Sequence, residues 1–297
     1  MRSEPLRAAL GADPVSGRTI GVDGVRLAYD DEGEGPVVLC LHSIAHGASD
    51  YAPLRARLGE RFRVVALDWP GHGRSDEDRV PASAARYAEI VERFADALGL
   101  RGVAVIGNSI GGAVAIRLAA RRPDLVRALV LADAGGLDRV DLTVRLASRA
   151  MARFFAAGAR GARWYPRAFA LYYGAVLSAP AASAQRARIV AASREMAPRL
   201  AEAWRSFGQP DADLRALAAR LACPVLVAWA KRDRVLLLRR SRPAIRRIAG
   251  ARLELFPGGH APFLECPDEF ARVLEGFLAD ALPPERAAPH GDRAAVG

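Results

Sequence analysis

Short apolar segments alternate with amphipathic helical patterns along most of the chain, and this alternation limits the folds open to it. The first two segments flank Asp23-Gly24, a hairpin signal, while most later ones are separated by helical patterns such as 82–98 and 110–121. Since parallel strands need crossover helices, the pattern predicts an α/β fold with a mostly parallel eight-stranded sheet flanked by helices. The eight predicted strands are 18–22, 25–30, 37–42, 63–68, 103–108, 128–132, 225–230 and 252–257.

The alternation is interrupted once, between residues 132 and 225. This stretch is rich in Ala and Arg and has helical periodicity without a convincing strand, which predicts a helical insertion after the sixth strand. We expect a core formed by residues 1–136 and 221–282 and a helical cap (lid) at 137–220. An amphipathic helix is predicted at 267–282, followed by an unstructured tail at 283–297.

The formal net charge is +10, and most of it falls in the insertion. Residues 137–220 contain 14 Arg and 6 acids, together with nine of the 20 aromatic residues. This composition predicts a basic surface over an aromatic interior. A solvated face is favoured over a site for an anionic substrate group or an anionic lipid surface, and nucleic acid is not an expected partner.

The sequence contains no apolar run near the roughly 20 residues that a membrane-spanning helix needs. The N-terminal residues do not resemble a secretory signal peptide. The three cysteines, Cys40, Cys223 and Cys266, match no disulfide or zinc framework, so we expect buried thiols and a cytoplasmic location. No pattern in the sequence defines an oligomeric state.

Gly107-Asn108-Ser109-Ile110-Gly111 has the form G-x-S-x-G, directly after a predicted strand and directly before a predicted helix. Such a turn presents the serine hydroxyl above the sheet, and the following amide, Ile110 N–H, lies at a helix N-terminus where an oxyanion can be stabilised. A structural turn serine is the alternative for an isolated motif. The strand and helix on either side favour a nucleophile.

With this motif, the sequence resembles the α/β-hydrolase fold superfamily, and the resemblance extends over nearly the whole chain. The resemblance implies that Ile44 N–H is a second oxyanion donor, that Asp233 is the catalytic acid and that His260 is the base. The matching segments are Leu41-His42-Ser43-Ile44, with Ser43 in place of the usual glycine, Asp68-Trp69-Pro70-Gly71-His72-Gly73-Arg74-Ser75, Trp229 to Val235 and Gly258 to Glu265.

The implied order Ser109, Asp233, His260 is that of the superfamily. In the implied mechanism, His260 takes the Ser109 proton, Asp233 orients the imidazole, and an acyl-enzyme forms and is hydrolysed. This scheme requires no metal and no organic cofactor. Asp133, just after the sixth predicted strand, is the second choice for the acid, because some family members carry their acid there.

Further residues are candidates for lining the pocket. For His42 and His72, a hydrogen bond that orders a loop is favoured over substrate contact, while His46 is undecided between substrate contact and solvation. Most aromatic residues of the insertion are expected to form its core, with a minority facing the pocket. The full set of pocket candidates is His42, Ser43, His46, Asn108, Trp164, Tyr172 and Phe263.

These features predict a serine hydrolase that cleaves a carboxylic ester or related acyl bond of a small, largely apolar acyl or aromatic substrate, which carries an anionic group in one alternative. Carbon–carbon bond hydrolase, lactonase, thioesterase and cofactor-free haloperoxidase or perhydrolase activities stay open on the same triad. A small-molecule receptor on the same fold is the alternative that is not an enzyme.

Overall fold

The computed structural model describes residues 17–282, and the tail predicted at 283–297 lies outside them. Its eight strands form one sheet in the order β1-β2-β4-β3-β5-β6-β7-β8, in which β2 runs opposite to the other strands. The α/β-hydrolase fold predicted from the sequence is confirmed. The strands are β1 (Arg18–Val22), β2 (Val25–Glu32), β3 (Val37–Leu41), β4 (Arg63–Leu67), β5 (Val103–Asn108), β6 (Val126–Ala132), β7 (Val225–Ala230) and β8 (Arg252–Phe256).

Local sequence explains how the sheet begins. β1 and β2 are joined by Asp23 (φ 54°) and Gly24 (φ 78°), so both turn residues have the left-handed backbone that a tight hairpin requires. The central strands β3, β5 and β7 are buried on both faces, as expected for apolar strands covered by helices.

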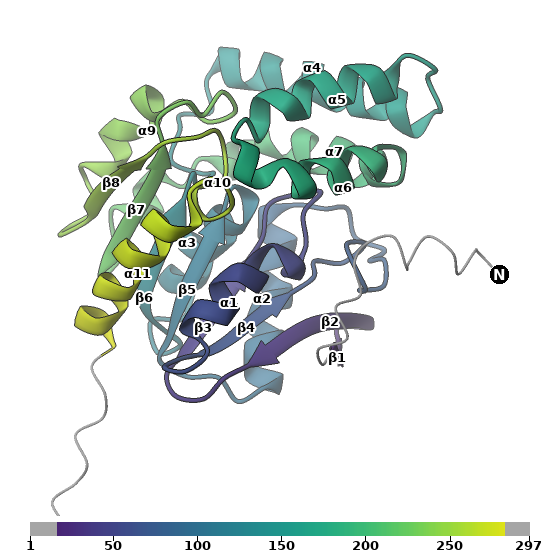
Figure 1. The fold of residues 1–297 in the computed structure, drawn as a ribbon. Helices are drawn as coiled ribbons and strands as arrows, with labels where there is room; N and C mark the ends of the chain where they lie inside the picture. The colour runs from purple at the N-terminus through teal and green to yellow at the C-terminus, as the bar shows by residue number, and fades with distance from the viewer. Residues whose placement is uncertain (1–16, 283–297) are drawn as a thin grey trace, which may run out of the picture.

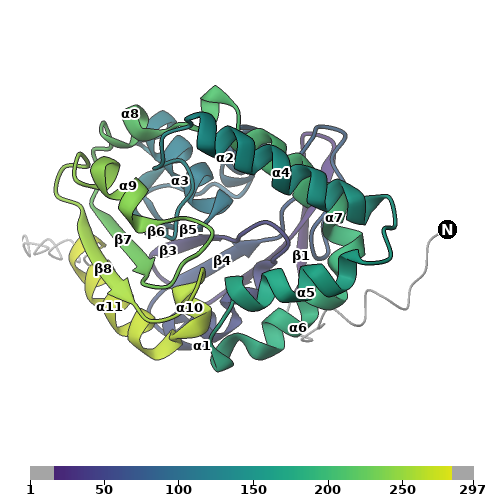
Figure 2. The ribbon, with the colours of Figure 1, turned by 90° about the horizontal axis from the view of Figure 1, so that it is seen from above.

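Helices cover both faces of the sheet (Figures 1 and 2). One face is covered by α1 (Ala52–Leu58) and α11 (Pro267–Ala281), and the other by α2 (Ala84–Ala97) and α3 (Ile110–Arg121). α2 begins after Ser83, whose side chain accepts a hydrogen bond from Arg86 N–H at 3.1 Å and so satisfies one free amide of the first turn. α8 (Arg215–Ala218) and α9 (Leu238–Ile245) lie on the same side as α3.

Four longer helices come between β6 and β7 and lie over one end of the sheet (Figure 1). They are α4 (Leu142–Ala159), α5 (Tyr165–Val176), α6 (Ser183–Ala191) and α7 (Ser193–Phe207). Aromatic side chains pack between them, with the Phe155 ring 6.3 Å from that of Phe169 on α5 and 6.2 Å from that of Trp204 on α7. That residues 137–220 act as a lid stays a prediction.

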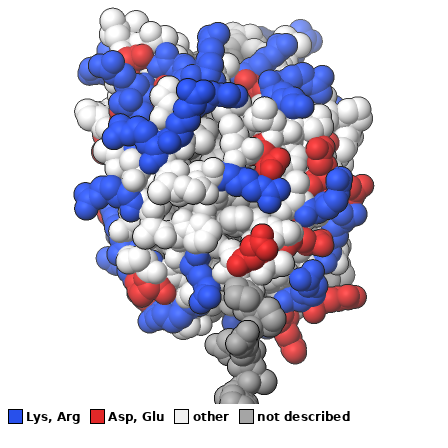
Figure 3. All heavy atoms as spheres, turned by 90° about the vertical axis from the view of Figure 1, so that its left-hand side faces the viewer, with Lys and Arg blue, Asp and Glu red and all other residues white. Residues whose placement is uncertain are grey.

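Basic side chains remain on the surface. Among the arginines of residues 137–220, only Arg199 and Arg215 form ion pairs with acids of the described chain. One face of the molecule shows Lys and Arg gathered toward the end that carries these helices (Figure 3). Within residues 17–282, no helix is both long enough and apolar enough to cross a membrane.

The contacts of Asp141 provide a test of what stabilises the start of α4. Its side chain accepts from Val144 N–H at 3.0 Å and pairs with Arg240 Nη2 at 2.8 Å, joining the start of α4 to α9. Asp141→Ala is expected to lower the free energy of unfolding in urea titrations, because it removes both the N-cap and the ion pair. Asp141→Asn, which retains an N-cap oxygen, should cost less. Equal losses would assign the stabilisation to the ion pair.

Candidate active site

Ser109 lies at a strained turn between β5 and α3. Its φ of 56° and ψ of −116° lie in a region that non-glycine residues rarely adopt. The turn is closely packed: a Cβ on Gly107 would lie 2.4 Å from the Gly111 carbonyl oxygen, and one on Gly111 would lie 2.2 Å from the Leu41 carbonyl oxygen. The two glycines of the motif are therefore required by close backbone approach.

Ser109, His260, Ile44 and Ile110 line the same cavity, of about 180 Å³. Neither Ile44 N–H nor Ile110 N–H has a hydrogen-bond acceptor within residues 17–282. Ser109 Oγ and His260 are not directly hydrogen bonded in this structure, and such bonds commonly tighten only when substrate is present. The cavity thus brings together a hydroxyl, an imidazole and two free amide donors.

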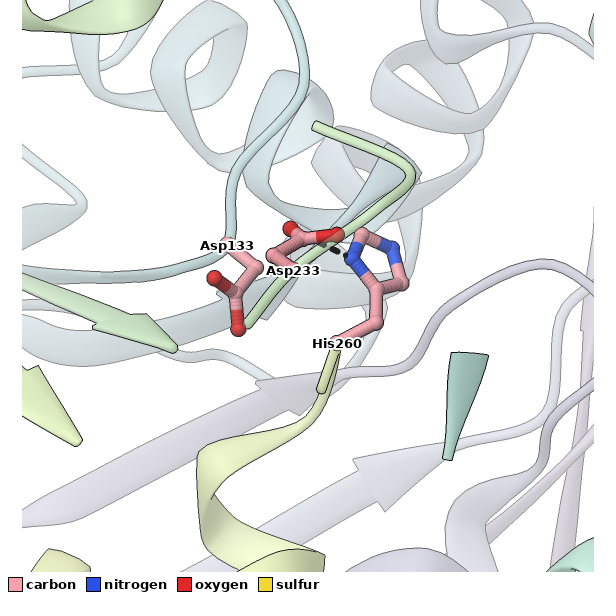
Figure 4. A group of neighbouring side chains, drawn as sticks. All are labelled: Asp133, Asp233 and His260. Carbon is pink, nitrogen blue, oxygen red and sulfur yellow. Dashed lines mark hydrogen bonds and ion pairs between the residues drawn. The ribbon is translucent and has the colours of Figure 1, made fainter. Parts of the chain in front are cut away.

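His260 is held by Asp233. Their Nδ1 and Oδ2 atoms lie 2.9 Å apart, and Figure 4 shows the Asp233 carboxylate directed at the imidazole. The other Asp233 oxygen accepts from Val235 N–H at 2.7 Å and Leu236 N–H at 3.0 Å. With Nδ1–H donating to Asp233, Nε2 is the nitrogen free to accept a proton.

Asp133 lies beside this pair (Figure 4). Ligand-type atoms of Asp133, Asp233 and His260 all lie within 4.8 Å of one another, yet the imidazole is bonded to Asp233 and not to Asp133. Asp133 Oδ1 accepts from Ala230 N–H at 2.9 Å, and its buried Oδ2 has no partner. Burial, and then the neighbouring Asp233 charge, raise the pKa of Asp133 well above its usual value, so we expect a neutral acid.

Two carboxylates and one imidazole are also a donor set that divalent metals accept. Here, however, Asp233 Oδ2 and His260 Nδ1 are engaged with each other, and neither aspartate lines the cavity. The arrangement therefore fits an imidazole hydrogen bonded to Asp233, with a neutral Asp133 beside them, better than a metal centre. The absence of a required metal or cofactor stays a prediction.

Two buried side chains hold the loop that carries His260. Asn108 Nδ2 donates to the carbonyl oxygens of His260 and Ala132, each at 3.0 Å. Glu265 accepts from Gly259 N–H at 2.6 Å with one oxygen. Its other oxygen accepts from Ser178 N–H at 2.8 Å and Ala179 N–H at 2.9 Å. Sequence reasoning missed Glu265, although a glutamate five residues after a candidate base is a visible signal.

Two neutral histidines order the loops around Ile44. His42 Nε2 accepts from Trp69 N–H at 3.0 Å, and His72 Nε2 accepts from Ala45 N–H at 3.1 Å. Ser43, which stands where the resemblance places a glycine, does not take a left-handed backbone; Ala45 does, with φ 65°. Burial lowers the pKa of His42 well below its usual value and that of His72 to about 4.

Two of the seven pocket candidates line the cavity, and five do not. Ser43 and Tyr172 line the cavity. His42 and Asn108 are fully buried, and His46, bonded to Asp50, is buried rather than solvated. Five candidates do not line the cavity, and these predictions are corrected: His42, His46, Asn108, Trp164 and Phe263. Phe263 is stacked on Tyr51 with ring centroids 4.7 Å apart, and Trp164, just before α5, is 53% exposed.

A serine at a strand-to-helix turn beside a His–Asp pair is typical of α/β proteins with a nucleophile elbow. Residues 38–273 match the model of the alpha/beta hydrolase family, and the chain belongs to this family.

Two relatives and one solved structure show how far the similarity extends. The chain is 32% identical to 2-hydroxymuconate semialdehyde hydrolase of Pseudomonas putida, over 90% of this chain and 96% of that one. It is 31% identical to pimeloyl-[acyl-carrier protein] methyl ester esterase of Chromobacterium violaceum, over 86% of this chain and 98% of that one. The crystal structure of a hydrolase from Pseudomonas aeruginosa matches with a TM-score of 0.73 at 29% identity, covering 90% of this chain and 99% of that one. The family and these relatives support hydrolase as the class of activity.

The acid pair yields a prediction. Asp233→Asn is expected to lower kcat by at least about a thousandfold, because the amide cannot stabilise a charged imidazole. Asp133→Asn should retain kcat within about tenfold, since an amide donor replaces a neutral carboxyl group. Kinetics on a hydrolysed ester would measure both. A larger loss for Asp133→Asn would make Asp133 the acid.

The buried histidines yield a second prediction. Because His72 has a lowered pKa in the folded state, the unfolded state binds more protons below about pH 6.5. The stability that this group contributes is present above that pH and is lost as pH falls toward about 4. Urea unfolding at pH 7.5, 6 and 5 should show a shallower loss in His72→Asn than in the native sequence. Equal slopes would contradict this assignment.

Proposed function

We propose that this protein is a serine hydrolase that cleaves a carboxylic ester or related acyl bond through Ser109, His260 and Asp233. The observation that carries this proposal is the shared cavity, which joins Ser109, His260 and the two unpaired amides of Ile44 and Ile110. A structural serine would need neither the strained turn nor two free donors beside it.

In this mechanism, His260 Nε2 removes the Ser109 proton while Oγ attacks the substrate carbonyl carbon. Asp233 keeps Nδ1 protonated and stabilises the charged imidazole. Ile44 N–H and Ile110 N–H hold the oxyanion, and the alcohol leaves with a proton from His260. Water then attacks the acyl-enzyme with His260 again as base. The scheme uses no metal or cofactor.

The cavity walls support a small, largely apolar substrate. Helices α4, α5 and α7 contribute Val144, Tyr172, Val176, Leu200 and Trp204 to the lining. Such walls favour an acyl chain or an aromatic ring. Residues 137–220 would then act as the lid of this site, on a protein that we expect to work in the cytoplasm.

Carbon–carbon bond hydrolysis is the second candidate. It is favoured by the 32% identity, over nearly full length, to a relative named 2-hydroxymuconate semialdehyde hydrolase. The same triad would serve, and a panel that contains both esters and vinylogous diketones separates the two activities. Turnover of the diketones alone would replace the ester assignment.

A fluorophosphonate probe tests the proposal without a known substrate. The native protein should gain the mass of one adduct, and Ser109→Ala should gain none, because the probe reacts with an activated serine. His260→Ala is the matched control and should slow labelling by at least about a hundredfold. Intact-mass spectrometry measures all three. No adduct on the native protein would favour a receptor that uses this fold without turnover.

A further inference from the structure

Arg117 is a buried cation in the same cavity as Ser109. It lies on α3 and is nine-tenths buried, and no part of the mechanism above uses it. Ser109, Ala113 and Arg117 are spaced four residues apart and all line the cavity. Residues with this spacing share one face of a helix, so the cavity follows α3 from the nucleophile to this arginine.

The hydrogen bonds of the Arg117 guanidinium are incomplete. Nη2 donates to the Asp211 carbonyl oxygen and lies 3.2 Å from Asp211 Oδ2. Nε is buried with no acceptor, and Nη1 has none within residues 17–282. Burial lowers the pKa of Arg117. Because an unpaired buried donor is costly, the buried Nε indicates that a ligand supplies an acceptor, and Nη1 is a second donor that is free to contact it.

The two acidic residues that line the cavity leave the Arg117 charge only partly neutralised. The Asp211 side chain is 62% exposed, so its carboxylate can turn into solvent at little cost, whereas the arginine cannot. Asp138, the other acid that lines the cavity, is bonded to Arg240 at 2.6 Å. A ligand anion beside Arg117 would therefore meet a positive charge that is only partly neutralised.

We propose that Arg117 binds a carboxylate carried by the substrate at the end remote from the scissile bond. The inference rests on the proposed function and narrows its substrate class to esters with an apolar chain that ends in an anion. Arg117 comes eight positions after Ser109, which corresponds to about 12 Å along the axis of a helix. The intervening Ala113 presents only a methyl group to the chain between the two ends.

Two matched series of substrates test this assignment. One contains p-nitrophenyl half-esters of linear dicarboxylic acids of graded length, and the other contains the same chains capped as neutral methyl esters. At the best length, the native protein should show a kcat/KM about tenfold to hundredfold higher for the carboxylate than for its neutral partner. A ratio of one or less at every length would overturn the proposal.

Arg117→Gln should bring that ratio close to one, through a higher KM for the carboxylate series. Asp211→Asn is the matched control, because it removes the same ion pair and leaves the cation, so its ratio should equal or exceed that of the native protein. If Arg117→Gln lowers kcat/KM equally for both series of substrates and Asp211→Asn does the same, Arg117 only ties α3 to the segment at Asp211, and the proposal is overturned.

Fluorophosphonate labelling of Ser109 separates a failure of this inference from a failure of the proposed function. Labelling without a carboxylate preference refutes this inference alone, and absent labelling refutes the proposed function.

Discussion

The left-handed backbone of Ser109 is the constraint on which the rest of the site depends. A non-glycine residue stays in this region only when its surroundings hold it there. Here β5 enters the turn from a fully buried sheet, α3 leaves it, and the Gly107 and Gly111 backbones leave no space for a side chain. The same turn places Ile110 N–H at the start of a helix, so one strained turn positions both the Ser109 hydroxyl and an amide donor.

The acid side of the site depends on a different principle. Asp133 and Asp233 follow β6 and β7 and are buried together. Two carboxyl groups this close do not readily both lose their protons, because their negative charges repel each other. Asp233 has three donors for its charge, namely two backbone amides and the imidazole, while Asp133 has a single amide. Asp133 is therefore the carboxyl group that we expect to hold a proton, and Asp233 is the one that contacts His260.

Much of this arrangement could be predicted from the sequence. The strand boundaries are predicted to within two residues, because short apolar runs between turns mark the buried strands. The largest differences are that β6 begins at Val126 and β2 ends at Glu32, because strand pairing continues past the apolar run. The motifs also predicted which loops meet. Side-chain direction was harder: His46 and Phe263 lie near the site in the chain but face Asp50 and Tyr51. Arg117 carries no local signal, because its burial and its contact with Asp211 depend on a segment 94 residues further along the chain.

The bonds of Glu265 have a mechanical consequence. A single carboxylate holds Gly259 N–H together with Ser178 and Ala179 N–H, and His260 N–H donates to Val176 O at 2.9 Å. These hydrogen bonds tie the end of α5 to the loop that carries His260. Any opening that displaced the end of α5 would carry the imidazole away from Ser109. If residues 137–220 form the lid that we propose, motion of α4 and α7 would leave these hydrogen bonds intact.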